Sequence, residues 1–253
     1  MQRLDGRTCL ITGASSGLGA HFARLVSRAG ARVVVAARRV DRVQALADEI
    51  RATGGEALPV ALDVSDEASV IAAYDAAEAA FGTVDTIIAN AGVSAPGRST
   101  EIAVEEMRSV LETNVLGVML TAREGARRLI SAGSRDSERG RIVLIGSITA
   151  EMTGQGETIY SASKAAVAQL GRNLAKEWAR LGINVNVVQP GYIQTELAGD
   201  WFSSDGGKAQ IASFSRRRLQ PINSLDAPVL YLCSDEAAHT TGGTFTIDDG
   251  QLL

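Results

Sequence analysis

The sequence predicts an α/β fold with one doubly wound parallel sheet and helices on both of its faces. Short apolar segments alternate with longer helical patterns from one end of the chain to the other. Apolar segments such as Val33–Ala37 show no polar alternation, which is typical of strands buried on both faces. With 253 residues, 45% of them hydrophobic, and without an internal repeat or linker, the chain is expected to form a single domain.

Seven strands and six helices are expected in order along the chain. Right-handed crossovers between parallel strands would place a ligand crevice at the carboxyl ends of those strands. The strands are expected at residues 8–12, 32–37, 57–61, 84–89, 141–146, 183–188 and 244–247. The helices are expected at residues 17–29, 40–53, 66–81, 104–132, 158–181 and 224–235.

Two stretches interrupt this alternation. Residues 131–140 form a polar segment before the fifth strand and are expected to be a solvated loop. Residues from about 195 to 222 form a long connection that contains Trp201, Phe202 and three consecutive arginines. A long connection in a compact domain is usually functional or mobile. The second stretch is therefore expected to take part in function.

A glycine-rich loop joins the first strand to the first helix. It runs from Thr12 to Gly19 with the spacing Gly-x-x-x-Gly-x-Gly. Glycine lets the backbone turn tightly and approach a pyrophosphate, whose charge then meets the N-terminus of the following helix. The order strand, glycine loop, helix predicts a dinucleotide site of the Rossmann type. The expected contacts are Gly13, Ser15, Ser16, Gly17, Leu18 and Gly19.

The end of the second strand indicates which dinucleotide is bound. Proteins of this fold that use NAD place Asp or Glu there to accept a hydrogen bond from the ribose 2′-hydroxyl. Here Ala37 holds the position and is followed by Arg38 and Arg39. A guanidinium pairs with a 2′-phosphate, which a carboxylate would repel. NADP(H) is therefore expected in preference to NAD(H).

Tyr160 and Lys164 lie four residues apart in a helical pattern and so share one face of that helix. A free phenol, with a pKa of about 10, transfers protons poorly at neutral pH. A nearby ammonium favours the phenolate and should lower that pKa. Beside a dinucleotide site, the pair is a candidate for proton transfer.

Further motifs follow the glycine loop in a fixed order. They are Asp63-Val64, Asn90-Ala91-Gly92, Asn114, Ser147, Tyr160 with Lys164, Pro190-Gly191 and Thr195. Together with the loop, these motifs resemble the short-chain dehydrogenase/reductase family over nearly the whole chain. The resemblance implies a single Rossmann-type domain that transfers hydride between a nicotinamide dinucleotide and a ketone or secondary alcohol.

The resemblance implies a role for each of four residues. Hydride transfer leaves negative charge on the carbonyl oxygen, so Tyr160 is expected to donate a proton to it and to accept one in the reverse direction. Ser147 would hold the same oxygen. Lys164 would also bind the nicotinamide ribose, and Asn114 would hold a water that links Lys164 to solvent. The other implied cofactor contacts are Asp63, Val64, Asn90, Ala91, Gly92, Pro190, Gly191, Ile193 and Thr195.

The resemblance further implies that residues 195–222 form a helical lid over the substrate. It also implies that helices 104–132 and 158–181 pair between subunits of a homotetramer. The substrate is expected to be a mainly apolar ketone or alcohol of medium or larger size, and Glu151 and Glu157 disfavour an anionic one. The pocket is expected to be lined by Ser94, Ser147, Thr149, Met152, Gln155, Tyr192, Ile193, Leu197, Trp201 and Phe202.

Three positions depart from the family pattern. Ala89 stands where a second Asn is frequent, and Asp249 stands where the family often has Gly. The first is expected to alter local hydrogen bonding and the second to affect subunit contacts. Gln189 replaces a small residue before the Pro-Gly pair, and the sequence assigns it no role. For Trp201 and Phe202, contact with the substrate and anchoring of the lid both remain open.

Composition excludes several classes of function. The net charge of −4 gives no sign of nucleic-acid or anionic-membrane binding. Cys9 and Cys233 are interpreted as small apolar residues, and His21 and His239 are isolated, so no metal site is expected. No apolar run reaches the roughly 20 residues of a membrane-spanning helix, and no signal peptide is visible. A cytoplasmic protein acting on a small molecule is expected.

Two alternatives remain open. A 3-oxoacyl-carrier-protein reductase shares every motif named above, and Arg127-Arg128 or Arg216–Arg218 could form a basic surface for the acidic carrier protein. A dinucleotide-sensing scaffold without turnover is the non-enzymatic alternative. Such a scaffold would be free to lose Ser147, Tyr160 or Lys164, whereas this chain has all three.

Overall fold

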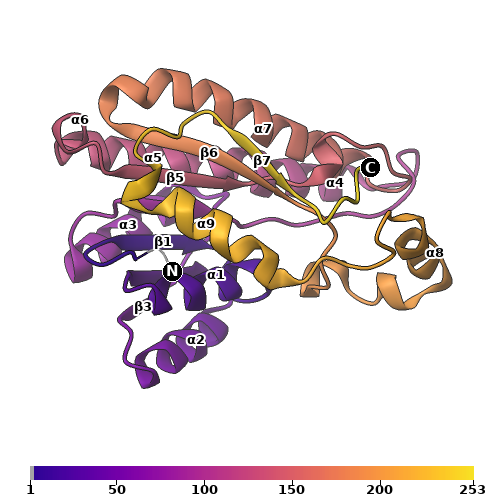
Figure 1. Cartoon of the computed structure of the whole chain (residues 1–253), viewed down its shortest axis with the longest axis horizontal. Coiled ribbons are helices and arrows are strands. Elements are labelled where there is room, and N and C mark those ends of the chain that lie inside the picture. Colours follow the sequence, from indigo (N-terminus) through magenta and orange to yellow (C-terminus); the bar gives the residue numbers. More distant parts are fainter. Residues whose placement is uncertain (1–2) are drawn as a thin grey trace.

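The computed structural model describes residues 3–253, and within them seven parallel strands form one sheet of order β3-β2-β1-β4-β5-β6-β7 (Figure 1). The chain winds from β1 to one edge and from β4 to the other. Sheets of this kind bind ligands at the carboxyl ends of the two central strands. The expected doubly wound fold is confirmed. The strands are β1 (Thr8–Thr12), β2 (Arg32–Ala37), β3 (Ala57–Ala61), β4 (Thr86–Ala89), β5 (Gly140–Ile145), β6 (Ile183–Pro190) and β7 (Thr244–Ile247).

Helices cover both faces of the sheet, with a hydrophobic core under each group. Alternate residues of a strand point to opposite faces, so Cys9 and Ile11 of β1 lie in one core and Leu10 lies in the other. The first core packs against α1 (Gly17–Arg28), α2 (Val40–Ala52) and α9 (Asp226–Cys233). The second packs against α3 (Glu67–Phe81), α5 (Gly117–Ser131) and α7 (Thr158–Trp178). Figure 1 shows α1 and α9 side by side.

The single helix expected over 104–132 is interrupted, so that prediction is wrong in detail. Helix α4 spans Val104–Leu111, and a π-helical turn, Glu112–Leu116, separates it from α5. Such turns insert a residue and are frequent at functional positions. The turn contains Asn114, whose buried side chain bonds the backbone of Val93. Periodicity could not show the insertion because this contact is made with a distant part of the chain.

The polar segment 131–140 is not a simple solvated loop. It contains a short helix, α6 (Ser134–Ser137), and the buried hydroxyl of Ser134 donates a 2.5 Å hydrogen bond to the carbonyl oxygen of Leu181. This bond ties the segment to the 3₁₀ turn that follows α7. The helix expected at 224–235 is also divided. It consists of a 3₁₀ turn at Ile222–Leu225, then α9, then a second 3₁₀ turn at Asp235–Ala237.

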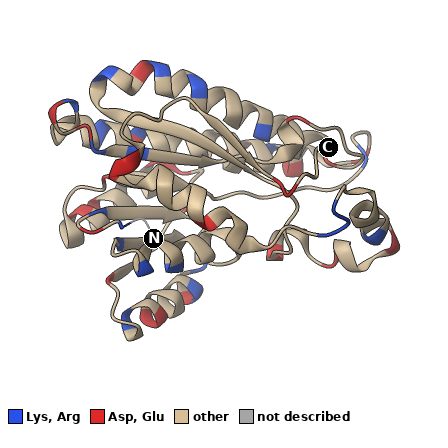
Figure 2. Ribbon diagram, viewed as in Figure 1, with Lys and Arg blue, Asp and Glu red and all other residues tan. Residues whose placement is uncertain are grey.

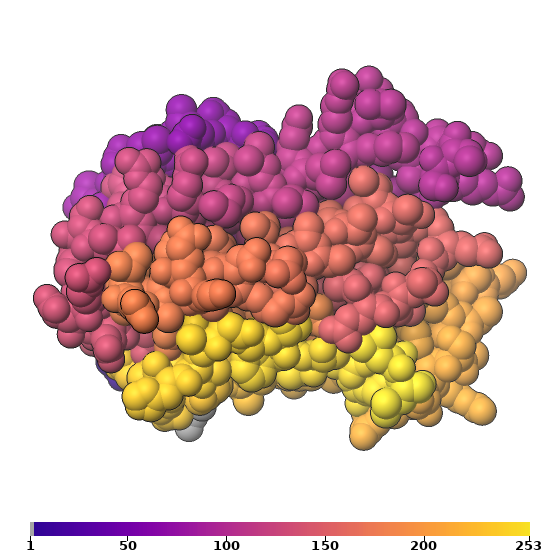
Figure 3. Space-filling view, turned by 90° about the horizontal axis from the view of Figure 1, so that it is seen from above, coloured from indigo at the N-terminus to yellow at the C-terminus, as the bar shows by residue number. Residues whose placement is uncertain are grey.

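The connection at 195–222 is folded. It contains two 3₁₀ turns, Glu196–Ala198 and Trp201–Ser203, and a helix, α8 (Asp205–Ser213). The Ser204 hydroxyl caps α8 by accepting a hydrogen bond from a backbone N–H group in its first turn. In Figures 1 and 3 this orange segment and the magenta segment around α4 project at the same end of the molecule.

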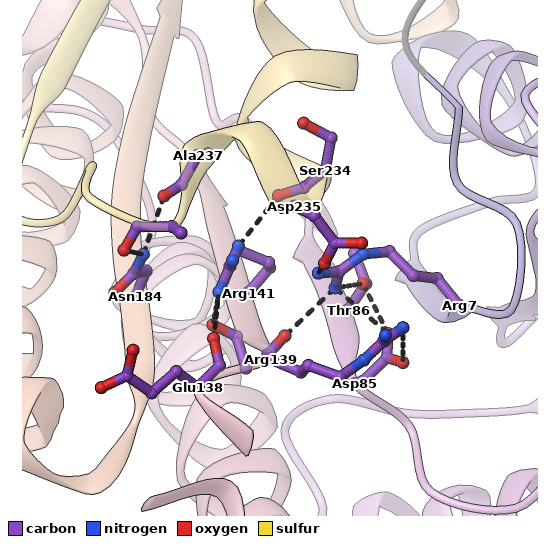
Figure 4. A network of polar contacts seen from close by, with 12 residues as sticks. Arg7, Asp85, Thr86, Glu138, Arg139, Arg141, Asn184, Ser234, Asp235 and Ala237 are labelled. Carbon is purple, nitrogen blue, oxygen red and sulfur yellow. Dashed lines mark hydrogen bonds and ion pairs between the residues drawn. The ribbon is translucent and has the colours of Figure 1, made fainter. Parts of the chain in front are cut away.

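A buried polar network lies at the end of the sheet where the strands begin, opposite to their carboxyl ends (Figure 4). Arg7, only 1% exposed, donates to Thr86 Oγ1 at 3.0 Å and to Asp235 Oδ1 at 2.5 Å. Arg141, only 2% exposed, donates to the carbonyl oxygen of Ser234 at 3.0 Å. These bonds join the starts of β1, β4 and β5 to the segment after α9. The network therefore stabilises the fold at the end remote from the ligand crevice.

Acidic and basic residues are interspersed over the helices and loops (Figure 2), in keeping with the small net charge. Cys9 and Cys233 are buried free thiols, as expected. Among residues 3–253, no helix combines the length and apolarity needed to cross a lipid bilayer.

Candidate active site

The glycine loop has a backbone that side chains would obstruct. Gly13 has a φ of +67°, and a Cβ atom there would lie 2.8 Å from the Cα atom of Ala91. A Cβ atom on Gly19 would lie 2.3 Å from the carbonyl oxygen of Gly13. Ser16 precedes α1 without capping it through its side chain, so the first N–H groups of α1 remain available to an anion. This cradle fits the pyrophosphate of a dinucleotide.

The end of β4 braces the loop. Asn90 Nδ2 donates to the carbonyl oxygen of Thr12 at 2.9 Å. Thr12 Oγ1 accepts hydrogen bonds of 3.0 Å from the backbone N–H groups of Asn90 and Ala91. The structure thus brings together the ends of the two central strands, as the sequence predicted.

The two arginines after β2 take different positions. Ala37 is buried at the strand end, and Arg38 is exposed. Arg39 Nη2 donates to Ser15 Oγ at 2.9 Å and to Ser16 Oγ at 2.8 Å. Arg39, not Arg38, therefore lies against the glycine loop.

Asp63 and Val64 follow the end of β3. Hydrogen bonds from Ser65 hold the Asp63 carboxylate, with 2.6 Å between Oδ1 and the Ser65 hydroxyl. The pKa of Asp63 is lowered chiefly by this hydrogen bond and to a smaller extent by Arg38. Val64 is buried against Gly117, where a Cβ atom would lie 2.6 Å from its Cγ2 atom. Both residues thus follow the carboxyl end of β3, at the same end of the parallel sheet as the glycine loop that follows β1.

Ser147 lies just beyond β5 and caps a 3₁₀ turn, Ile148–Ala150. Its Oγ atom accepts hydrogen bonds from Thr149 N at 3.2 Å and from Thr149 Oγ1 at 3.0 Å. Thr149, a predicted pocket residue, is only 3% exposed and is directed at Ser147. The Ser147 hydroxyl also lies close enough to the phenol of Tyr160 to lower the pKa of that phenol. The predicted serine and tyrosine are therefore adjacent.

Lys164 lies one helical turn beyond Tyr160 on α7. It is 3% exposed, and its Nζ atom is 5.6 Å from the centroid of the Tyr160 ring. Burial lowers the pKa of Lys164 to about 8. The pKa of Tyr160 is raised to about 12, mainly by burial; the nearby Ser147 hydroxyl opposes this rise and the Glu157 carboxylate reinforces it. The expected lowering of the Tyr160 pKa is thus wrong for this structure, because burial outweighs any effect of the ammonium.

Asn114 links the π-helical turn to α7. Its Oδ1 atom accepts from Val93 N at 2.8 Å, and its Nδ2 atom donates to Ser163 Oγ at 3.0 Å. A Cβ atom on Gly92 would lie 3.4 Å from Asn114 Oδ1 and 3.6 Å from Lys164 Nζ. The amide oxygen and the ammonium therefore face the same point beside Gly92.

Two glutamines that the sequence analysis did not single out hold the Pro190-Gly191 pair at the end of β6. A Cβ atom on Gly191 would lie 2.7 Å from Gln220 Oε1 and 2.6 Å from Gln251 Oε1. Gln220 Oε1 accepts from Gly191 N at 3.0 Å, and Gln251 Oε1 accepts from Tyr192 N at 2.6 Å. Both glutamines are buried, so the Pro190-Gly191 turn is fixed from both sides.

Gln189 and Asp249, two of the residues that depart from the family pattern, make contacts within the chain. Gln189 is 1% exposed and accepts a 3.1 Å hydrogen bond from Thr246 Oγ1 of the neighbouring strand β7. The Asp249 carboxylate pairs with Arg218 at 2.6 Å and Arg216 at 3.3 Å. Asp249 therefore ties the end of the 195–222 segment to the C-terminal turn, within the same chain.

Trp201 and Phe202 point in different directions. Phe202 is buried, with its ring edge-on to Tyr192 at 5.9 Å. Phe214, which the sequence analysis missed, stacks on Tyr192 at 5.7 Å. Trp201 is 52% exposed, and its Nε1 atom donates to Gln210 Oε1 of α8 at 2.7 Å. Phe202 thus anchors the segment to its own chain, whereas Trp201 lies along α8.

Glu157, which the sequence analysis named only as a carboxylate that disfavours an anionic substrate, contacts a predicted pocket residue. Its Oε2 atom accepts a 2.9 Å hydrogen bond from the Tyr192 hydroxyl. Ile193 is buried, Ser94 and Met152 are partly buried, and Gln155 and Leu197 are exposed. Gly97 N donates to the carbonyl oxygen of Gly156 at 3.0 Å, which joins the loop after β4 to the loop before α7. The predicted pocket residues therefore differ in their exposure to solvent, and the loops after β4 and before α7 that carry several of them lie together.

This arrangement is typical of oxidoreductases that use a nicotinamide dinucleotide. The glycine cradle fits a pyrophosphate, and a phenol lies beside a serine and a lysine. No three His, Cys, Asp or Glu side chains within residues 3–253 form a group suited to a metal ion.

Comparison with known proteins defines the family. Residues 7–206 match the short chain dehydrogenase family. The chain is 32% identical over 249 residues to 3-oxoacyl-[acyl-carrier-protein] reductase FabG of Escherichia coli, covering 98% of each chain. It is 38% identical over 253 aligned residues to cis-4-hydroxycyclohexanecarboxylate dehydrogenase of Sinomonas cyclohexanicum, covering 96% of each. A gluconate 5-dehydrogenase from Burkholderia cenocepacia, solved with NADP and tartrate, matches with a TM-score of 0.93 and 30% identity, over 99% of this chain and 96% of that one. The chain belongs to the short-chain dehydrogenase/reductase family and is an oxidoreductase of that family.

Proposed function

We propose that this oxidoreductase interconverts a ketone and a secondary alcohol with NADP(H), and that Tyr160 is its general acid and base. The observation that carries the proposal is the grouping of Ser147, Tyr160 and Lys164 beside Gly92 at the carboxyl ends of β4 and β5. A phenol, a hydroxyl and an ammonium are thus grouped where the reacting carbonyl and the cofactor would meet. The proposal includes a cytoplasmic homotetramer.

The roles of the side chains follow from their contacts. Tyr160 donates its phenolic proton to the carbonyl oxygen as negative charge develops on it, and Ser147 donates a hydrogen bond to the same oxygen. The bound dinucleotide supplies the hydride. Lys164, held against the backbone, binds the nicotinamide ribose and offers positive charge to the phenolate. Asn114 holds a water that returns the proton from solvent through Lys164.

The dinucleotide would be held by residues from several strand ends. The glycine loop would receive the pyrophosphate, and Arg39 with Ser15 would receive the 2′-phosphate that distinguishes NADP(H). The gluconate 5-dehydrogenase cited above was solved with NADP, which supports this preference. The remaining contacts are Leu18, Arg38, Asp63, Val64, Asn90 to Gly92, Pro190, Gly191, Ile193 and Thr195.

We propose a substrate without a required carboxylate or phosphate near the reacting carbon. The Glu157 carboxylate lies close enough to raise the pKa of Tyr160, so it would repel an anionic substituent there. The rings of Tyr192 and Phe202 supply apolar surface, and the 195–222 segment serves as the lid. An apolar ketone of medium or larger size suits these surroundings.

The test is consumption of NADPH by purified protein against a panel of aromatic, cyclic and long-chain ketones, with an acetoacetyl thioester and a small keto acid included. Turnover of neutral ketones supports the proposal. Activity confined to the thioester or the keto acid would contradict the proposed substrate class and leave the reaction type intact.

Reduction of 3-oxoacyl thioesters is the second candidate, and the Escherichia coli relative favours it. Ion pairs made by the arginines of the two candidate basic surfaces weaken this second candidate. Arg128 pairs with Asp75, Glu78 and Glu124, and Arg216 and Arg218 pair with Asp249. The charge of Arg128 is therefore neutralised by its neighbours, whereas Asp249 offsets only one of the three positive charges at Arg216–Arg218. A dinucleotide-sensing scaffold is the non-enzymatic candidate, and any turnover that depends on Tyr160 would exclude it.

A further inference from the structure

Glu196 bridges two arginines at the edge of the cofactor crevice. It begins the 3₁₀ turn directly after Thr195 and so belongs to the 195–222 lid segment. Its Oε1 atom accepts a hydrogen bond from Arg39 Nη1, and its Oε2 atom accepts one of 2.6 Å from Arg42 Nη1. Arg42 lies in the first turn of α2. One carboxylate thus joins the lid to the segment that follows β2.

The same arginine also contacts the glycine loop. Arg39 donates through Nε and Nη2 to Ser15 Oγ, and through Nη2 to Ser16 Oγ. A Cβ atom on Gly17 would lie 3.5 Å from Thr195 Cβ, so the start of the lid rests on the loop. Two guanidinium groups therefore contact one anion, the carboxylate of Glu196, and one of these groups, that of Arg39, also contacts the hydroxyls of Ser15 and Ser16.

Arg39 and Ser15 are also the residues proposed to receive the 2′-phosphate of NADP(H). Arg39 offers a planar fork to an anion, and the hydroxyls of Ser15 and Ser16 can donate to one as well. A phosphate carries a charge of about −1.5 to −2 at pH 7, so it and the Glu196 carboxylate repel each other at one arginine. A ribose 2′-hydroxyl carries no charge and can instead donate a hydrogen bond to the carboxylate.

We propose that Glu196 is a selectivity residue that competes with the 2′-phosphate of NADP(H) for Arg39 and Arg42, and that phosphate binding releases the start of the lid. The inference rests on the proposed use of NADP(H). The pKa of Glu196 is lowered by the hydrogen bonds from Arg39 and then Arg42, which keeps the competing carboxylate charged. By thermodynamic linkage the two effects are reciprocal. The factor by which the Glu196 contacts weaken phosphate binding equals the factor by which bound phosphate weakens those contacts.

The test is a calorimetric titration with two probes that differ by one phosphate, adenosine 2′,5′-bisphosphate and adenosine 5′-monophosphate. Glu196→Gln should tighten the bisphosphate roughly three- to tenfold, since two exposed ion pairs no longer compete, and should not tighten the monophosphate. Glu56→Gln, an exposed substitution just before β3, is the matched control and should change neither affinity. Arg39→Leu should weaken the bisphosphate at least roughly tenfold.

The outcomes separate the two proposals. If Arg39→Leu weakens the bisphosphate and Glu196→Gln leaves it unchanged or weaker, the inference about Glu196 fails and the NADP(H) preference stands. If the wild type binds both probes equally and Arg39→Leu changes neither, the preference fails and the inference fails with it.

Tryptophan fluorescence tests the release of the lid. Trp201 is exposed five residues beyond Glu196, whereas the other tryptophan, Trp178, is 6% exposed on α7. The bisphosphate should change the emission of the wild type more than the monophosphate does, and the difference should largely vanish in Glu196→Gln. An identical emission change with both probes in the wild type would overturn the coupling to the lid.

Discussion

The Nζ atom of Lys164 donates a 2.8 Å hydrogen bond to the carbonyl oxygen of Ile145, the last residue of β5. Ser147 follows two residues later, and Tyr160 precedes Lys164 by one turn of α7. This single bond therefore fixes the helix that carries the phenol against the strand that leads to the serine. Lys164 is also almost wholly out of contact with water, so its charge should affect the pH dependence of stability.

The buried ammonium should make stability depend on pH. The pKa of Lys164 is lowered from 10.5 to about 8, so between these values the unfolded chain binds more protons than the folded one. The burial penalty acts fully below pH 8 and is relieved as the pH rises to 10.5. Relative to Lys164→Met, the wild type should gain on the order of 3 kcal/mol of unfolding free energy between pH 7.5 and 10.5. Urea unfolding of both proteins at each pH measures this. A constant difference between them would show that the lysine titrates normally.

The Glu157 carboxylate should shift the pH dependence of catalysis. Its charge contributes to the raised pKa of Tyr160, after the larger effect of burial. Ketone reduction needs the protonated phenol and should decline as the pH rises through that pKa. Glu157→Gln removes the charge, so the decline in kcat/KM should move to lower pH. Glu151→Gln, an exposed position in the same loop, is the control. A move to higher pH, or none, would contradict the assignment of the titrating group.

Substitutions at the end of β2 should reverse the preference for NADP(H) over NAD(H). Ala37→Asp with Arg38→Leu supplies the carboxylate that accepts from a ribose hydroxyl and should swing kcat/KM toward NAD(H). Because Arg39 is the arginine that contacts Ser15, Arg39→Leu alone should cost more NADP(H) efficiency than Arg38→Leu alone. Steady-state kinetics with both cofactors measures the ratio. Equal efficiency of the unmodified protein with NADP(H) and NAD(H) would refute the preference.

The α4–α5 surface should mediate assembly. Four apolar side chains on this surface are 43–52% exposed: Val104, Leu111, Leu116 and Ile130. Their separations along the chain are close to whole numbers of helical turns when the wider π-helical turn is counted, so they lie along one side of the two helices. Light scattering should give about four times the monomer mass of 26.5 kDa, and Leu111→Glu should reduce it. Val40→Glu, at a 49% exposed position on α2, should leave the mass unchanged. A wild type of monomer mass would rule out the tetramer.

The fold could be predicted because its signals are local. The apolar segments that became strands need only their own residues to be recognised, and the glycine loop is defined by its spacing between a strand and a helix. Tyr160 and Lys164 shared one helical face as their separation of four residues required. These features depend on period and order along the chain.

The missed features depend on contacts between distant segments. Gln220 and Gln251 are unremarkable polar residues until the fold places their amides beside Gly191. The π turn at Asn114 exists together with the bonds to Val93, and Phe214 gains its role from stacking on Tyr192. The raised pKa of Tyr160 was mispredicted because the sequence shows a nearby ammonium but not the burial that outweighs it.

The central claim, that Tyr160 is the acid of a ketone reductase, is tested most directly by Tyr160→Phe. The variant keeps the ring and removes the proton donor, so NADPH affinity measured by fluorescence titration should stay within about twofold. Tyr231→Phe, which removes a hydroxyl bonded to Thr240 far from the crevice, is the matched control. Single-turnover oxidation of bound NADPH by the best ketone should slow at least roughly 100-fold in Tyr160→Phe and remain unchanged in Tyr231→Phe. A Tyr160→Phe variant that retains more than about 5% of the wild-type rate would contradict the account, because another group would then be donating the proton.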